Sequence, residues 1–164
     1  MLTSAFSHIG LGHFLFNMIA FHQFSQLLVV TPGLKAIRHF GTLIVGSALA
    51  GSAAFLSHDK TAVSVGGRQV ERSGLGFSGV VSGVATALAL LHPYQRMLLM
   101  GVVPVPLWLL GIGYVAYDSY AMENPDSTVA HDAHLGGAIF GAAYYMIALR
   151  RFGGLFGKAG LKGR

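Results

Sequence analysis

The 164-residue chain contains no cysteine and very few charged residues. The absence of cysteine excludes a disulfide framework and thiolate chemistry, and it removes the usual indication of redox compartment. Charged residues form 10% of the chain, whereas soluble domains contain roughly 25%. Hydrophobic residues form 53%. This composition excludes an ordinary soluble domain and indicates an integral membrane protein.

The sequence also has neither a visible targeting peptide nor a basic amphipathic face. The first residues, 1–4, contain no basic region followed by an apolar core, so no signal or transit peptide is visible. The formal charge of +5 is spread over short loops and the tail instead of one amphipathic face. We therefore expect no nucleic-acid binding.

Five apolar stretches are present, each near the length that a membrane helix needs, about 20 residues. They cover residues 10–30, 40–56, 76–91, 97–117 and 133–149. No repeat or linker divides them, so the sequence predicts a single domain over 1–164 with an all-α fold, a polytopic bundle of about five transmembrane helices. The two prolines at 104–106 are expected to kink the fourth helix near its start.

The charges are sorted between the two ends of these helices. The loops after the first and third helices and the C-terminal tail carry eight basic residues and no acid: Lys35, Arg38, Arg96, Arg150, Arg151, Lys158, Lys162 and Arg164. The opposite face carries all six acids: Asp59, Glu71, Asp118, Glu123, Asp126 and Asp132. By the positive-inside rule, the tail faces a cytoplasm-like compartment.

A serine flanked by glycines, Gly76-Phe77-Ser78-Gly79, begins the third apolar stretch. Ser78 on a tight turn, with small neighbours, has the access that a nucleophile requires. Gly79 and Gly83, four residues apart, equally suit close helix packing. Ser82 is a rival nucleophile one turn deeper in the membrane.

A histidine near the start of the last apolar stretch, His134, is the candidate base. Gly137 and Gly141 give its helix a face of small residues, and contact of that face with the third helix would bring Ser78 and His134 together. His131 and Asp132 are candidates for a third member of a triad. Because Asp132 is only two residues from His134, we expect a dyad, with Asp132 a solvated loop acid.

His13 and Asn17 lie four residues apart, and therefore on one side of the first helix. Both can donate hydrogen bonds into one space, as the stabilisation of an oxyanion requires. The alternative is a hydrogen bond that locks this helix to a neighbour. His8 is expected to support the site as a structural neighbour.

Other chemistries have weaker support. His8, His13, His131 and His134 do not form a His-Glu-x-x-His motif, so no metal and no other cofactor is expected. The acids fall in or beside loops, which argues against a two-aspartate membrane protease. No matching pair of broken helices indicates a transporter.

These motifs together resemble the rhomboid family of intramembrane serine proteases. They are His8, the His13–Asn17 segment, Gly76–Gly79 and the 133–137 segment Ala-His-Leu-Gly-Gly. The resemblance implies that Ser78 is the nucleophile and His134 the general base, with His13, Asn17 and the Ser78 amide as oxyanion hole. Gly76, Gly79 and Gly137 would support the site.

The resemblance is strongest to the mitochondrial, presenilin-associated branch, which implies a multi-pass protein of the mitochondrial inner membrane. Its substrates would be transmembrane proteins in the lipid bilayer. Rhomboids usually have six core helices, and this chain begins where the second is expected; many also have tyrosine at the position of Ser82. The alternative function is a non-catalytic rhomboid-fold protein that binds membrane clients. The sequence does not indicate substrate identity, cleavage site or oligomeric state.

Overall fold

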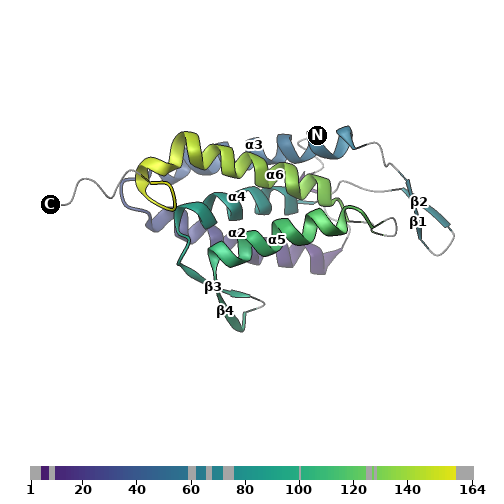
Figure 1. Cartoon of the computed structure of the whole chain (residues 1–164), viewed down its shortest axis with the longest axis horizontal. Helices are drawn as coiled ribbons and strands as arrows, with labels where there is room; N and C mark the ends of the chain where they lie inside the picture. The colour runs from purple at the N-terminus through teal and green to yellow at the C-terminus, as the bar shows by residue number, and fades with distance from the viewer. Residues whose placement is uncertain are drawn as a thin grey trace.

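The computed structural model describes residues 5–7, 10–58, 62–65, 68–71, 76–99, 101–124, 127 and 129–157, with only the backbone described at 62–65 and 68–71. Five α-helices lie within these ranges (Figure 1): α2 (Leu11–Val30), α3 (Ala36–Ser57), α4 (Ser78–Leu91), α5 (Leu107–Ala121) and α6 (His131–Tyr144). A π-helical segment, Tyr145–Leu149, and a short 3₁₀ turn, Arg150–Phe152, continue α6.

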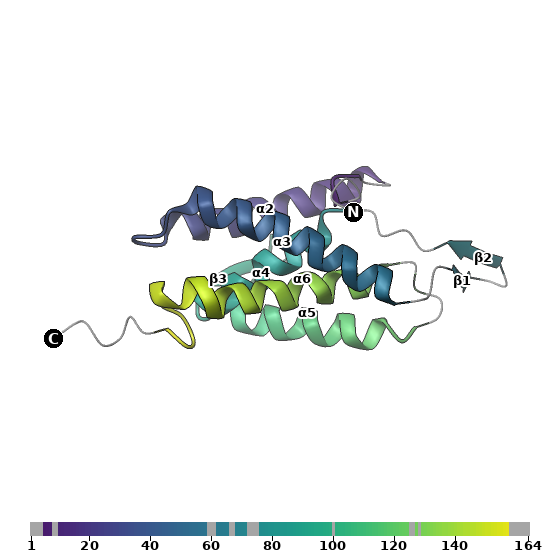
Figure 2. The same ribbon diagram turned by 90° about the horizontal axis from the view of Figure 1, so that it is seen from above.

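Two antiparallel hairpins join the helices. Strands β1 (Ala62–Val65) and β2 (Arg68–Glu71) lie between α3 and α4, and β3 (Arg96–Leu99) and β4 (Val103–Pro106) lie between α4 and α5. Figures 1 and 2 show the β1–β2 hairpin beyond one end of the bundle, with the yellow end of the α6 segment at the other end. Both hairpins are therefore connections outside the helical core.

Helix α4 is the centre of the bundle, with the other four helices around it (Figures 1 and 2). Its side chains Val80, Val84, Ala87 and Leu88 are completely buried. At 1.5 Å per residue, its 14 residues span about 21 Å. This central helix is thus shorter than the hydrocarbon layer, which is about 30 Å thick.

Exposed apolar residues and buried polar residues follow the pattern of a membrane bundle. Ile112 on α5 and Ile139 on α6 are 61% and 71% exposed, whereas Asn17 and Asp118 are 3% and 5% exposed. Of the described helices, α3 alone has the length and composition that by themselves would suit a membrane span. The outward apolar surface would face lipid, and the polar groups are enclosed by protein.

Glycines bring α4 and α6 into backbone contact, as the small-residue spacing suggested. A Cβ atom added at Gly137 would overlap the carbonyl oxygen of Gly79, and one added at Gly141 would overlap that of Gly83. Only glycine, whose side chain is a hydrogen atom, therefore fits at these two positions. The first turns of the two helices consequently lie side by side.

The prediction of a fourth helix over 97–117 was wrong at both ends. Residues 96–99 and 103–106 form the paired strands β3 and β4 instead of a kinked helix, with a turn at Gly101 (φ 75°). Pro104 and Pro106 have no N–H to donate, so this segment begins no helix until Leu107. Two-stranded edges tolerate proline. Helix α5 then continues to Ala121, past the expected end.

Candidate active site

Ser78 is the first residue of α4, at the end of a sharp turn. The turn depends on Gly76, whose φ of 132° lies in a region that residues with a side chain rarely adopt. A Cβ atom at Gly76 would also lie only 2.6 Å from Cε1 of His13. Glycine is therefore required here for the turn and for the approach of the His13 ring.

The side chains of Ser78 and His134 are in hydrogen-bonding contact. The distance from Ser78 Oγ to His134 Nε2 is 2.8 Å. The two residues lie in the first turns of α4 and α6, the helices that the glycines bring into contact. This places a hydroxyl beside a base, the basic geometry of an activated serine.

A carboxylate that sequence reasoning did not select, Asp118, contacts the other nitrogen of His134. Asp118 Oδ1 lies 3.0 Å from Nδ1 of His134 and 2.6 Å from Nδ1 of His131. On its far side, His131 Nε2 lies 2.9 Å from Ser127 Oγ. The predicted dyad was thus incomplete, because His134 has an acidic partner in the structure.

This network defines the proton positions of the candidate base. An ionised carboxylate only accepts hydrogen bonds, so Asp118 requires a hydrogen on Nδ1 of both His131 and His134. In its neutral form, His134 then has an unprotonated Nε2, which can accept the Ser78 hydroxyl proton. Asp118 is 5% exposed, so water competes little for its carboxylate.

Asp118 was missed because it was assigned to a loop over 118–132. Helix α5 in fact includes Asp118 and directs it into the bundle, where His131 and His134 converge. The stretch from Tyr117 to Ala121 contains no glycine or proline to stop a helix. That continuity was the one signal that could have placed the acid on the helix.

The description of Asp132 as a solvated loop acid was also wrong. Asp132 lies in the first turn of α6 and is 4% exposed. Its Oδ1 accepts a hydrogen bond from the Ala133 amide at 2.9 Å, and its Oδ2 lies 3.4 Å from Nδ1 of His58. The carboxylate therefore interacts with the end of α3 and makes no described contact with His134.

The structure places the two candidate oxyanion donors beside the same space. His13 and Asn17 on α2 line a cavity of about 410 Å³ together with Ser78 and His134. Asn17 Nδ2 donates one hydrogen bond to the His13 carbonyl, at 2.8 Å, and an amide group has a second N–H. His8 lies outside the described residues.

The cavity is bounded by four helices, α2, α4, α5 and α6. Tyr114 and Tyr117 of α5 face it, as do Phe16 and Phe24 of α2. Its lining is mainly apolar with a few converging polar groups, as in most ligand sites. Ser82, the rival nucleophile, also lines the cavity, but His134 Nε2 bonds to Ser78.

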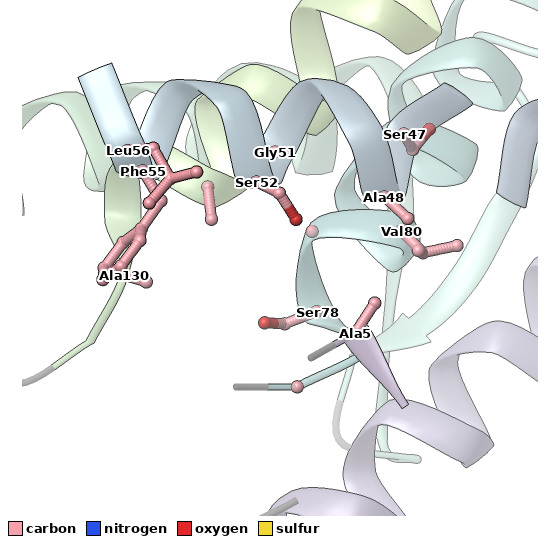
Figure 3. A pocket seen from close by; sticks show the side chains of 13 residues that line it. Ala5, Ser47, Ala48, Gly51, Ser52, Phe55, Leu56, Ser78, Val80 and Ala130 are labelled. Carbon is pink, nitrogen blue, oxygen red and sulfur yellow. The ribbon is translucent and has the colours of Figure 1, made fainter. Parts of the chain in front are cut away.

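A second, smaller cavity of about 210 Å³ also borders Ser78. Figure 3 shows it below α3, with the Ser52 side chain pointing from that helix into the space above Ser78 and Phe55 beside Ala130. Gly76 and Gly79 complete the wall around the serine. Ser78 is thus reached from two spaces.

Comparison with known proteins now decides the family. The Rhomboid domain matches residues 1–151. The chain belongs to the rhomboid family. This rhomboid is 36% identical to "RHOMBOID-like protein 12, mitochondrial" of Arabidopsis thaliana over 166 residues, or 93% of the chain and 47% of that protein. It is 32% identical to "Rhomboid protein 1, mitochondrial" of Saccharomyces cerevisiae over 146 residues, or 88% of the chain and 40% of that protein.

The rhomboid chain spans less than half the length of either curated relative. No solved structure matches it. Membership confirms the predicted fold class, since the rhomboid domain is a helical membrane bundle. The name of each relative places that relative in mitochondria.

One group of side chains in this rhomboid has the composition of a metal site. Among the described residues, Asp118, His131 and His134 offer ligand atoms that all lie within 4.8 Å of one another. In the structure both imidazole Nδ1 atoms contact Asp118 Oδ1. An ion bound there would replace these hydrogen bonds and the Nδ1 proton of His134, so it would compete with the arrangement that leaves Nε2 open toward Ser78.

Proposed function

We propose that this rhomboid is an intramembrane serine endopeptidase that hydrolyses peptide bonds of membrane-anchored proteins. The observation that carries the proposal is the 2.8 Å contact between Ser78 Oγ and His134 Nε2, in a cavity that also holds His13 and Asn17. Family membership supports the proposal. We also propose a multi-pass protein of the mitochondrial inner membrane, for which the names of the two relatives support the organelle.

The first half of the reaction follows from these contacts. His134 Nε2 takes the proton from Ser78 as Oγ bonds to the scissile carbonyl carbon, and the carbonyl oxygen becomes an oxyanion. The Ser78 N–H lies in the first turn of α4, where helix amides have no intrahelical acceptor. This N–H, with His13 and Asn17, would stabilise the oxyanion. His134 then gives the proton to the departing amine as the C–N bond breaks.

Water completes the reaction. A water molecule attacks the acyl group on Ser78, His134 accepts its proton, and the serine ester bond breaks to release a carboxylic acid. The proton returns from His134 to Ser78 Oγ, so the enzyme is regenerated without a cofactor. Throughout, Asp118 would hold the imidazole ring and stabilise its protonated form, which has two N–H donors.

A transmembrane substrate would enter the 410 Å³ cavity between α2 and α5. Its backbone must be extended at the cleavage site, because a helix hides its carbonyl groups in hydrogen bonds. We therefore expect helix-breaking residues near the substrate bond. Cleavage would occur near the acid-rich ends of the helices, where α4 and α6 begin.

The test is activity on a transmembrane reporter in liposomes, combined with labelling by a fluorophosphonate probe. The wild-type chain should cleave the reporter and accept the probe on Ser78. A chain that folds but neither cleaves nor becomes labelled would contradict the proposal and favour the non-catalytic, client-binding alternative. Labelling that persists in Ser78→Ala and disappears in Ser82→Ala would assign the nucleophile to Ser82.

A further inference from the structure

A basic groove lies at the opposite end of the bundle from Ser78. It has a volume of about 520 Å³ and is formed by the turn after α2, the first turns of α3 and the end of the α6 segment. Three cationic side chains from these three segments line it, Lys35, Arg38 and Arg151. No acid among the described residues lines it. The groove therefore combines two cations from the start of α3 with a third, Arg151, that is far from them in sequence.

The three cations have no acidic partners within the part of the chain that the structure describes. The ion pairs seen there join histidines to Asp118 and Asp132 and involve no lysine or arginine. The Arg151 guanidinium lies 4.7 Å above the ring of Phe152, which restricts its position at the groove edge. These charges are thus available to an anion from outside the chain.

The floor of the groove is polar and hydrogen-bonded. His39 is 8% exposed, and its Nδ1 lies 2.8 Å from the hydroxyl of Tyr144. The His39 ring is 5.9 Å from the Tyr144 ring and 5.7 Å from the Phe152 ring. This cluster joins α3 to the segment that follows α6, and Arg38 and Arg151 of these two elements line the same groove.

We infer that the groove binds the phosphate headgroup of an anionic phospholipid. Guanidinium groups form paired hydrogen bonds with phosphate oxygens, and basic pockets between membrane helices recognise such headgroups. Val30 at the end of α2 and Ile37 at the start of α3 are 67% and 86% exposed, and such apolar side chains would suit the acyl chains. A bundle in a membrane keeps this end at the lipid surface. The inference does not depend on peptidase activity.

Native mass spectrometry of the full chain in detergent tests the inference, with phosphatidylglycerol and phosphatidylcholine as the probes. Phosphatidylglycerol should remain bound and phosphatidylcholine should not. Replacing Lys35, Arg38 and Arg151 together by Gln should weaken phosphatidylglycerol binding about 100-fold, or about five-fold for each charge. The melting temperature of the variant verifies that it folds.

Arg96→Gln is the matched control. Arg96 is exposed on β3, beyond α4 at the same end of the bundle, and it does not line the groove. The control should retain phosphatidylglycerol as the wild type does. Equal losses in Arg96→Gln and Arg38→Gln would show general attraction to positive charge and overturn the proposal.

Inorganic phosphate separates a lipid site from a site for a free anion. If the acyl chains contribute, phosphate at the concentration of the lipid should not displace phosphatidylglycerol. Displacement at equal concentration would overturn the assignment to lipid. Tyr144→Phe should weaken retention less than Arg38→Gln, because it removes one hydrogen bond of the floor and leaves the charges in place.

Discussion

The two ends of the bundle place ionisable side chains in opposite ways. At the end with Ser78, Asp118 and His131 are 5% and 2% exposed and are bonded to each other and to further polar groups. At the other end, Lys35, Arg38 and Arg151 line an open groove, and no described residue gives them an acidic partner. A buried, internally paired network can hold a proton at a defined atom. Unpaired surface cations instead suit recognition of an external anion.

The largest effect is expected at the nucleophile. Ser78→Ala should reduce reporter cleavage about 10⁴-fold or more, because no other group on α4 contacts His134 Nε2. The melting temperature should change little. Ser82→Ala is the control, and it should keep most of the activity.

The next largest effect is expected from a comparison of two equally buried acids, Asp118 and Asp132. Asp118→Asn should lower kcat about 100-fold or more, since a neutral amide accepts weaker hydrogen bonds from the two histidines and does not stabilise protonated His134 as a carboxylate does. Asp132→Asn is the matched control, because Asp132 is 4% exposed but interacts with His58 instead of His134. Kinetics at several pH values should show the Asp118→Asn defect at each pH. Equal kcat losses in the two variants would contradict an orienting role for Asp118.

A third test separates the contact that aligns the two helices from the chemistry of the site. Gly137→Ala should destabilise the fold by about 1–3 kcal/mol, because its methyl group would overlap the Gly79 carbonyl. Gly113→Ala on α5 meets nothing within 4 Å, and it should stabilise the helix by up to about 1 kcal/mol. Unfolding in detergent measures both changes. A Gly137→Ala variant with the free energy of unfolding of the wild type would show that α4 and α6 can separate without loss of fold.

The smallest effect concerns a histidine in the loop at the basic end. Burial lowers the pKa of His92 below its ordinary value of 6.5, and its Nε2 lies 2.8 Å from Thr31 Oγ1. The His92 ring therefore binds a proton more readily in the unfolded chain than in the folded one. Neutral His92 contributes to the stability of the fold above pH 6.5, and this contribution is lost as pH falls through the lower pKa of the folded state.

Unfolding measured from pH 7.5 to 5 should show this loss in the wild type. His92→Gln can still donate a hydrogen bond but does not titrate, so its stability should fall less over the same range. Identical slopes in the two proteins would exclude His92 as the source.

Particular residues show how far the sequence could be interpreted. The spacing of Gly79 and Gly83, and of Gly137 and Gly141, correctly indicated which helix faces meet, because only small residues allow backbone contact. The contact of Ser78 with His134 follows from that pairing. The hairpin over 96–106 was not foreseen, since its apolar residues match those of a membrane helix. Strand pairing at that point depends on prolines and a turn glycine.

The sequence alone determined the helical membrane class, the order of the motifs and the candidate serine and histidine, because composition and local spacing are properties of the chain itself. Tertiary structure alone decided the partner of His134. Asp118 is 16 residues from His134 along the chain, and only the packing of α5 against α6 brings the two within 3.0 Å. It also decided that Arg151 shares one groove with Lys35 and Arg38, since the long separation of Arg151 from these two residues in sequence contains no information about their distance in space.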